Sequence, residues 1–321
     1  MTKIKNWVNH VDLRSFRFWF QLAAFVLLVY GGRLAIDLGN SLPTFSCGYN
    51  RENGGVCYLL PLQHQLAQPW SRLFSGMGLA VLTGLGTFVL WFIVINKGWC
   101  GYICPLGTIQ DWITALRKKM GIRYSTYSDD QFKKLKVIKY VLLLLLIFIP
   151  LGIGGQFLSH DLGTPFCKIC PGRMIVPMFN GDFSQWVIDF ASTERMILTA
   201  LGMFITGLFL VGSFIKKRFF CFFCPMSALH YIFAKLSPFK LIKDGGKCTR
   251  CGDCYRVCDM EIRPIADDVV SVDILKDDCI MCLKCVAACP EEGCLKVNVL
   301  GKTVFEATES GFKKRMTPPE E

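Results

Sequence analysis

Residues 248–290 read CTRCGDCYRVCDMEIRPIADDVVSVDILKDDCIMCLKCVAACP, and this stretch decides how the last quarter of the chain folds. It contains two cysteine runs of identical spacing, C-x2-C-x2-C-x3-C, at residues 248–258 and 279–289. This spacing lets three thiolates of one run converge on a cubane, while the fourth cysteine of each run ligates the other cluster. The stretch therefore predicts an α+β domain of the bacterial ferredoxin type with two [4Fe–4S] clusters.

The crossed ligation assigns each cluster three cysteines from one run and one from the other. The first cluster is assigned to Cys248, Cys251, Cys254 and Cys289, and the second to Cys279, Cys282, Cys285 and Cys258. A structural zinc site and disulfides are the alternatives for these cysteines. One feature departs from the bacterial pattern, because Asp259 follows Cys258 where a proline is usual, whereas Pro290 follows the second run. Cys294 comes after the second run and is assigned no ligand role.

The part of the chain before the cysteine runs is strongly apolar. Apolar residues make up 52% of the whole sequence, and they gather in stretches at about 18–36, 73–95, 137–158 and 195–215. Each stretch is close to the roughly 20 residues that a helix needs to cross a bilayer. We therefore expect a cytoplasmic segment 1–17, a four-helix transmembrane domain 18–239, the ferredoxin domain 240–300 and a tail 301–321.

The distribution of basic residues orients these helices. The net charge is +11, and lysine and arginine are concentrated before the first apolar stretch, between the second and third, and after the fourth. Cytoplasmic loops carry such an excess, so both termini are expected in the cytoplasm of a bacterium or archaeon, with the chain crossing the cytoplasmic membrane several times. The first apolar stretch is not followed by a small-residue cleavage site. The charge is explained by topology and predicts no nucleic-acid partner.

Eight further cysteines fall in four pairs, and the pairs repeat. Cys100 and Cys104-Pro105 parallel Cys221 and Cys224-Pro225, and the offset from Cys104 to Cys224 is 120 residues. The offset from Cys47 to Cys167 is also 120 residues, and each of these two cysteines follows an Asp-Leu-Gly sequence. The pattern predicts an all-α four-helix bundle made of a duplicated two-helix unit.

The topology places one group of cysteines at the inner ends of the second and fourth helices. This inner group consists of Cys100, Cys104, Cys221 and Cys224. Four converging thiolates there predict a third cluster, surrounded by aromatic side chains that can exclude water. The alternative is a set of reduced thiols without a metal.

The remaining pairs belong to the outer face, and their chemistry is left open. This outer group consists of Cys47, Cys57, Cys167 and Cys170. It fits a fourth iron–sulfur cluster, disulfides in an oxidising exterior, or a zinc or copper site. The inner and outer groups would be nearly a bilayer apart, roughly 30 Å. An electron path between them then requires sites that lie deeper in the membrane, or a quinone as carrier.

Other residue types add little chemistry. No catalytic residue is assigned, and the apolar stretches hold no chain of acidic residues or lysines that would indicate a proton or ion pump. His64 and His160 lie in outer loops, where they are candidates for accepting a quinol proton, although a solvated histidine explains them as well.

The combination of motifs resembles the NapH-type membrane polyferredoxins. The resemblance rests on the four apolar stretches, WCGYICP at 99–105, CFFCP at 221–225 and the two C-terminal runs, and it covers most of residues 15–295. It extends to related modules of the NosR, MauN and CcoG types. The second inner motif has one residue fewer than is usual in the family, and the outer pairs are an addition.

The resemblance implies a membrane protein that passes electrons between a cytoplasmic donor or the quinol pool and an extracytoplasmic reductase or cytochrome. Other redox subunits are the implied partners, and the chain would be the quinol-oxidising electron-transfer subunit of such a complex. The alternative is a maturation or regulatory factor that delivers reducing equivalents or a metal to an extracytoplasmic metalloenzyme.

Overall fold

The computed structural model of the chain describes residues 12–34, 57, 59–73, 77–126, 128–275 and 278–309. Internal contacts divide the chain into two compact units, each assembled from separated segments. The first unit comprises residues 1–20, 92–102 and 227–321, and the second comprises residues 21–91 and 103–226. The expectations for Cys47 and for the end of the tail lie outside the described residues.

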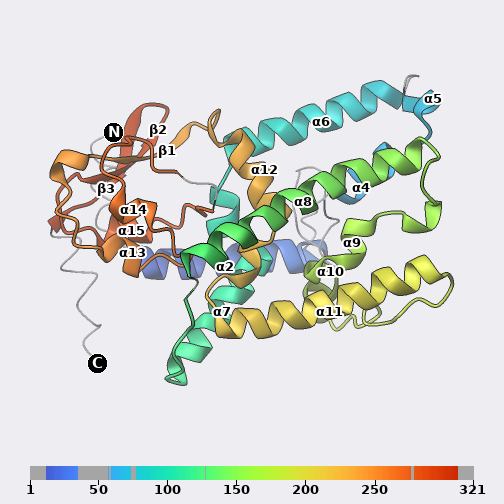
Figure 1. Cartoon of the computed structure of the whole chain (residues 1–321), viewed down its shortest axis with the longest axis horizontal. Coiled ribbons are helices and arrows are strands. Elements are labelled where there is room, and N and C mark those ends of the chain that lie inside the picture. The colour runs from blue at the N-terminus through green and yellow to red at the C-terminus, as the bar shows by residue number, and fades with distance from the viewer. Residues whose placement is uncertain are drawn as a thin grey trace. The chain divides into compact units, whose positions relative to one another are not determined.

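The long helices follow the apolar stretches of the sequence. They are α2 (Leu13–Tyr30), α6 (Met77–Val94), α8 (Asp129–Gly154) and α11 (Thr193–Ile215), labelled in Figure 1. Three segments are long and apolar enough to cross a membrane: Leu13–Tyr30, Lys134–Gly154 and Thr193–Ile215. α6 adds a shorter apolar segment, Val81–Val94. Three of the four expected spans thus have candidates among the described helices, and the fourth span stays a prediction.

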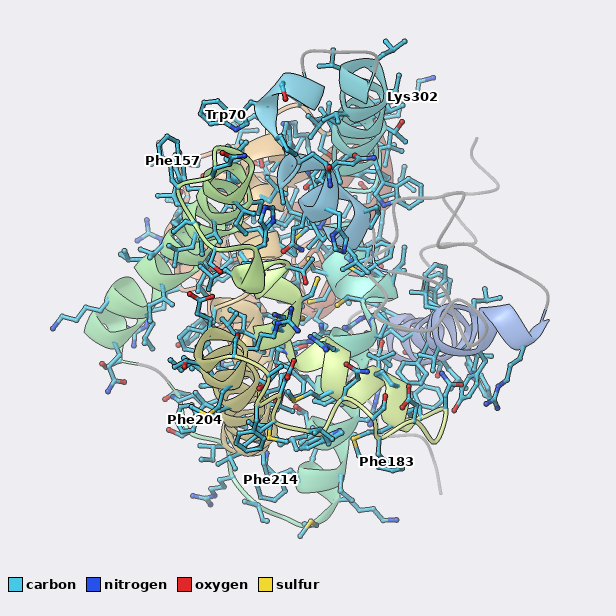
Figure 2. The ribbon with its side chains drawn as sticks, turned by 90° about the vertical axis from the view of Figure 1, so that its right-hand side faces the viewer. Trp70, Phe157, Phe183, Phe204, Phe214 and Lys302 are labelled. Carbon is cyan, nitrogen blue, oxygen red and sulfur yellow. The ribbon has the colours of Figure 1, made fainter. Side chains whose placement is uncertain are left out.

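Large apolar side chains on these helices face outward. Phe204 on α11 is 69% exposed, and Figure 2 shows it directed away from the ribbon. Leu82 on α6 and Phe148 on α8 are 67% and 63% exposed. Side chains of this kind are rarely exposed to water along a whole helix, but the hydrocarbon core of a bilayer covers them well.

α8 begins eight residues before the apolar stretch expected from residue 137, because its start is capped. The Ser128 hydroxyl accepts a hydrogen bond from the Gln131 amide, and the Gln131 side chain accepts one from the Ser128 amide. This reciprocal capping box satisfies two amide groups at the helix start. The polar first turns therefore extend the apolar helix toward its N-terminus.

Three shorter helices begin where a cysteine meets a proline. They are α7 (Pro105–Lys119), α10 (Pro171–Met178) and α12 (Pro225–Ala234). Proline suits the first helical position because it has no amide hydrogen to leave unsatisfied and its φ angle is already helical. The remaining short elements are α4 (Leu59–Leu66), α5 (Trp70–Leu73), α9 (Pro165–Ile169), the single turns η1 (Gly31–Leu34), η3 (His160–Leu162), η4 (Phe219–Phe222) and η5 (Gly245–Lys247), and the π-helical turn η2 (Trp99–Ile103).

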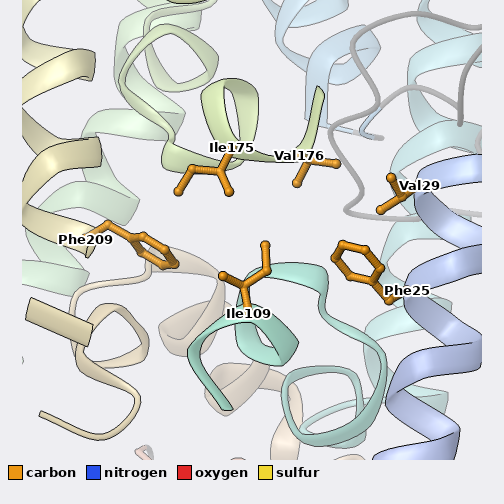
Figure 3. Packing of buried hydrophobic residues seen from close by; sticks show 6 residues of the cluster. All are labelled: Phe25, Val29, Ile109, Ile175, Val176 and Phe209. Carbon is orange, nitrogen blue, oxygen red and sulfur yellow. The ribbon is translucent and has the colours of Figure 1, made fainter. Parts of the chain in front are cut away.

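The core of the second unit packs α7 against α10. Ile109 of α7 lies in one buried cluster with Ile175 and Val176 of α10, and α2 and α11 complete it (Figure 3). The full set is Phe25, Val29, Ile109, Ile175, Val176 and Phe209. Ile109 and Ile175 each stand five residues after the cysteine of a Cys-Pro pair. Their contact brings the starts of these two helices together.

The ferredoxin part of the first unit is an α+β fold. Its sheet has the order β1 (Phe239–Lys243), β2 (Leu295–Val299), β3 (Lys302–Glu306), and all pairs are antiparallel. β2 and β3 form a hairpin through Leu300 and Gly301, whose φ angles of 50° and 79° suit a tight turn. The sheet therefore continues past residue 300, where the sequence analysis ends the domain. The helices α13 (Asp253–Arg256), α14 (Pro264–Asp267) and α15 (Lys284–Ala288) complete the fold.

Candidate iron–sulfur cluster sites

The two cysteine runs of the ferredoxin part fold alike. Arg250 and Gly252 flank Cys251 and have φ angles of 57° and 80°, and Met281 and Leu283 flank Cys282 with φ angles of 48° and 61°. Left-handed backbone is costly for residues other than glycine, so it persists only where the surroundings impose it. The same strained turn at the same place in both runs curls each chain segment around a common centre.

Each run surrounds a cavity together with one cysteine of the other run. The first cavity, cavity A, is lined by the four cysteines assigned to the first cluster, Cys248, Cys251, Cys254 and Cys289, and by one further cysteine. The second, cavity B, is lined by Cys258, Cys279, Cys282 and Cys285. Each cavity thus brings the last cysteine of one run to the first three of the other, and their ligation of clusters stays a prediction.

The residues present fit a polynuclear cluster better than a single ion. Among the described residues, no three Cys, His, Asp or Glu side chains converge as ligands of one metal ion. A cubane is larger than an ion, so its thiolates stand around a space, as the cysteines of cavities A and B do. Burial raises the pKa of Cys258 and of Cys279 to about 12. A thiolate so disfavoured requires a bound cation, which iron supplies.

Cys294 also lines cavity A, although the sequence analysis gave it no ligand role. It is 1% exposed, and its Sγ lies 3.6 Å from the Asp244 carbonyl oxygen, to which it donates. Burial, followed by the charges of Cys289 and Cys248, raises its pKa to about 12. Burial and the neighbouring cysteines therefore keep this thiol protonated, as a weak donor.

The inner group divides between the two units. Cys100 lies on the π turn η2 in the first unit, whereas Cys104, Cys221 and Cys224 belong to the second. Within the second unit, Cys104 precedes α7 and interacts electrostatically with Cys221 on η4; burial raises the pKa of Cys104 to about 11, and the Cys221 charge adds to this shift. The positive end of the α7 dipole faces the Cys104 position, which favours negative charge there.

Cys57 of the outer group lies nearer to Cys104 of the inner group than the sequence analysis expected. Burial raises the pKa of Cys57 well above its ordinary value, and the charges of Cys167, Cys170 and Cys104 raise it further. A separation of roughly 30 Å would suppress the interaction between Cys57 and Cys104. The Gln63 side chain donates to Cys167 at 3.2 Å. Three outer cysteines thus share one buried region, which lies deep enough to interact with Cys104.

Comparison with known proteins identifies the kind of molecule. A 4Fe-4S binding domain model matches residues 77–123 and 198–243, and a 4Fe-4S dicluster domain model matches residues 240–290. The ferredoxin-type protein NapH of Haemophilus influenzae is 26% identical over 222 residues, which are 66% of this chain and 66% of NapH. These matches support a NapH-type polyferredoxin family for the chain.

Two further relatives agree with this. The methylamine utilization ferredoxin-type protein MauN of Methylorubrum extorquens is 28% identical over 254 residues, 74% of this chain and 75% of MauN. YccM of Escherichia coli is 27% identical over 240 residues, 74% of this chain and 62% of YccM, so the polyferredoxin spans less than two thirds of that relative. No solved structure matches the chain. The polyferredoxin is thus a membrane iron–sulfur electron-transfer protein whose cofactors are [4Fe–4S] clusters.

Three polar residues of the polyferredoxin's inner region escaped the sequence analysis. The buried Gln110 lies with its Nε2 3.6 Å from the Cys221 Sγ, and its Oε1 accepts from the Phe220 amide at 2.9 Å. Arg218, 1% exposed, binds Asp111 with two hydrogen bonds from its guanidinium. Arg218 was counted only as a basic flank of the last span. The one signal in the sequence is the presence of Gln110 and Asp111 in a short helix directly after a Cys-Pro pair.

The histidines in the described part of the polyferredoxin fall into two kinds. His64 on α4 and His160 on η3 are exposed, as expected for loops outside the spans. His230 on α12 is instead 1% exposed and stacks on Phe92, with ring centroids 4.2 Å apart. Both of its ring nitrogens are buried without a hydrogen-bond partner among the described residues. His230 is therefore a neutral packing residue of the first unit.

Proposed function

We propose that this polyferredoxin carries single electrons across the cytoplasmic membrane of a bacterium or archaeon. Its donor would be a cytoplasmic redox protein or the quinol pool, and its acceptor an extracytoplasmic reductase or cytochrome, reached with other redox subunits. The observation that carries the proposal is the pair of cavities, each lined by three cysteines of one run and the fourth of the other. When bound there, [4Fe–4S] clusters supply one-electron transfer.

Four groups of cysteines are proposed as ligands. Two are the linings of cavities A and B, the third is the inner group, and the fourth is the outer group with Cys47 included. The chain's own contribution is to bury the thiols, to exclude water from them and to supply donors such as Gln63 and Gln110. These features set the stability and the reduction potential of a bound cluster.

The interaction between Cys57 and Cys104 supports a continuous path. Electron transfer between the two faces needs redox centres spaced more closely than the roughly 30 Å of a bilayer core. Sites that lie deeper in the membrane meet this requirement without a diffusing carrier between the inner and outer groups.

A cavity beside cavity B supports a quinol as the electron donor. It has a volume of about 270 Å³, and its apolar lining includes Phe16 of α2, Gly98 next to α6 and Met281 and Leu283 of the second cysteine run. Tyr102 contributes a hydroxyl to this lining, and that hydroxyl lies 3.4 Å from the Cys282 carbonyl oxygen. An apolar ring with polar oxygens fits a mainly apolar pocket with one hydroxyl.

The quinol proposal has a direct test, because a Cβ on Gly98 would meet no atom within 4 Å. Gly98→Leu fills the cavity and is expected to slow reduction by a quinol at least tenfold. Reduction of the same variant by dithionite should be unchanged. Equal slowing by both reductants would argue against a quinol site, since it would indicate general damage.

A maturation role is the second candidate, and the outer group decides between the two. In that role the outer cysteines would exchange disulfides or hold copper for an extracytoplasmic enzyme. All the described cysteines are free thiols, with Cys57, Cys167 and Cys170 among them. A disulfide formed by an outer cysteine would therefore have to involve Cys47 or a cysteine of another protein.

Iron and acid-labile sulfide per polypeptide, measured anaerobically, test the proposal. We expect about sixteen irons for four clusters of four irons each, and about twelve in a Cys57→Ser/Cys167→Ser variant. Cys294→Ser serves as the matched control and should keep all of them. About twelve irons in both the wild type and the double variant would show that the outer cysteines bind no cluster, and would favour the maturation role. Fewer than about eight irons would refute the electron-transfer proposal.

A further inference from the structure

Lys243 is a buried cation at cavity A. It ends strand β1, is 3% exposed and lines cavity A together with the four cysteines assigned to the first cluster. Its ammonium group donates to the carbonyl oxygens of Ile265 and Ala266 at 2.8 and 2.9 Å. The two carbonyls hold the charge in place but carry no compensating negative charge.

No carboxylate of the described residues forms an ion pair with Lys243. Removing an ammonium group from water without a counter-charge costs several kcal/mol in proteins, and such a group usually loses its proton or acquires a partner. Cavity A offers a partner, since four ligating thiolates and a cubane carry net negative charge. Cys254, whose thiol lies on this side of the cavity, interacts electrostatically with Lys243.

Cavity B is built differently. The charged residue in its lining is Asp259, which accepts a hydrogen bond from Lys284 and lies 4.0 Å from Arg17. The charge of Asp259 is therefore compensated within the protein, and the buried Lys97 interacts electrostatically with Cys279 from outside the lining. The other charged residues at cavity A, Arg250 and Glu291, have opposite signs and are less deeply buried.

We propose that Lys243 is the counter-ion of the cluster held by Cys248, Cys251, Cys254 and Cys289, and that it raises that cluster's reduction potential. The inference rests on the proposed function, because it requires a cluster in cavity A. Reduction adds one negative charge to the cluster, and a fixed positive charge nearby stabilises the reduced form more than the oxidised form. Lys243 thereby makes cavity A a more favourable place for an electron than it would be without this charge.

Potentiometric titration of the full chain in detergent, followed by electron paramagnetic resonance, tests the role. The signal of the first cluster is identified as the one that a Cys251→Ala variant lacks. Lys243→Met and Lys243→Gln both remove the charge, and the glutamine keeps a donor for the two carbonyls. Both should lower the midpoint potential of the first cluster and leave the other signals unmoved. Lys243→Arg keeps the charge and should retain the wild-type potential.

Lys240→Met is the matched control, since Lys240 lies on the same strand and pairs with Asp273 at a partly exposed site. It should leave the potential unchanged. An unshifted potential in both neutral Lys243 variants, with iron content equal to wild type, would overturn this inference alone. Loss of the first cluster from both neutral variants would also contradict it and assign Lys243 a structural role. A wild-type chain without iron would instead refute the proposed function.

Discussion

Asp259 shows how one residue outside the family pattern acquires a role. Ferredoxins usually place a proline after the last cysteine of such a run, and the aspartate here is 4% exposed. Lys284 donates to its Oδ2 at 2.5 Å, and Arg17 lies 4.0 Å from the same oxygen. Arg17 also donates to the Gly101 carbonyl at 3.4 Å. Within the first unit, Asp259 therefore joins the second cysteine run to the start of α2.

Replacing this carboxylate should destabilise the first unit. Asp259→Asn removes the negative charge that faces Lys284 and the buried Arg17, and we expect a loss of about 3 kcal/mol, the low end for a broken buried pair because Lys284 is partly exposed. Thermal unfolding followed by the visible absorbance of the clusters measures it. The control is Asp253→Asn, whose exposed pair with Arg256 should contribute less than about 1 kcal/mol. Equal losses in both variants would contradict the anchoring role.

His230 makes stability depend on pH in a predictable direction. Burial, and then the charge of Lys97, lower the pKa of His230 well below its ordinary value of 6.5. Below about pH 6.5 the unfolded chain binds a proton that the folded chain does not, so stability falls by about 1.4 kcal/mol per pH unit. Above that pH, His230 is neutral in both the folded and the unfolded chain, and it no longer makes stability depend on pH.

His230→Phe should therefore unfold with a weaker pH dependence than the wild type between pH 7.5 and 5.5. The aromatic ring preserves the stacking on Phe92, and the variant has no nitrogen to protonate. Melting temperatures at several pH values provide the measurement. Parallel pH profiles of the two proteins would show that His230 does not titrate on unfolding.

At the scale of elements, the turn η2 has little room around its glycine. A Cβ on Gly101 would clash with the carbonyl oxygen of Ile280, in the loop that carries the second cysteine run. Tyr102, the next residue, lies with its hydroxyl 3.4 Å from the Cys282 carbonyl oxygen of that loop. The π turn thus lies against cavity B through backbone contacts that only glycine permits.

Gly101→Ala should consequently disturb cavity B, since both sides of the contact are backbone and cannot move aside. We expect the variant to lose about four irons, those of one cluster, when it is purified anaerobically. Gly98→Ala lies on the preceding turn, where a Cβ meets nothing within 4 Å, and it should keep its full iron content. A full iron content in Gly101→Ala would mean that η2 and the loop at Ile280 can move apart without a loss of cluster binding.

At the scale of the whole molecule, the two units do not follow the order of the chain. The first unit takes residues 1–20 and 92–102 together with the ferredoxin part, although the sequence analysis assigned both segments to other regions. Among the described residues, the soluble-looking domain therefore shares contacts with the start of α2 and with η2. Such contacts require these segments and the ferredoxin part to lie on the same side of the membrane.

This arrangement predicts the topology of the chain. A reporter that matures only in the cytoplasm should be active at the N-terminus and at the C-terminus. A reporter that requires export should be active only in the outer loops, for example after Gly181, which has a φ angle of 77° in an exposed turn. An active exported reporter at the C-terminus would contradict both the charge distribution and the composition of the first unit.

The sequence by itself determined the two cysteine runs, their cluster chemistry, the resemblance to the NapH-type proteins and three of the apolar helices, because these depend on local spacing and composition. Only the tertiary structure brought Lys243 to cavity A, Asp259 to Arg17, and Gln110, Asp111 and Arg218 together beside Cys221. It also brought Cys57 of the outer group within reach of Cys104. Burial and pairing of charges depend on contacts between residues far apart in the chain, and no local pattern encodes them.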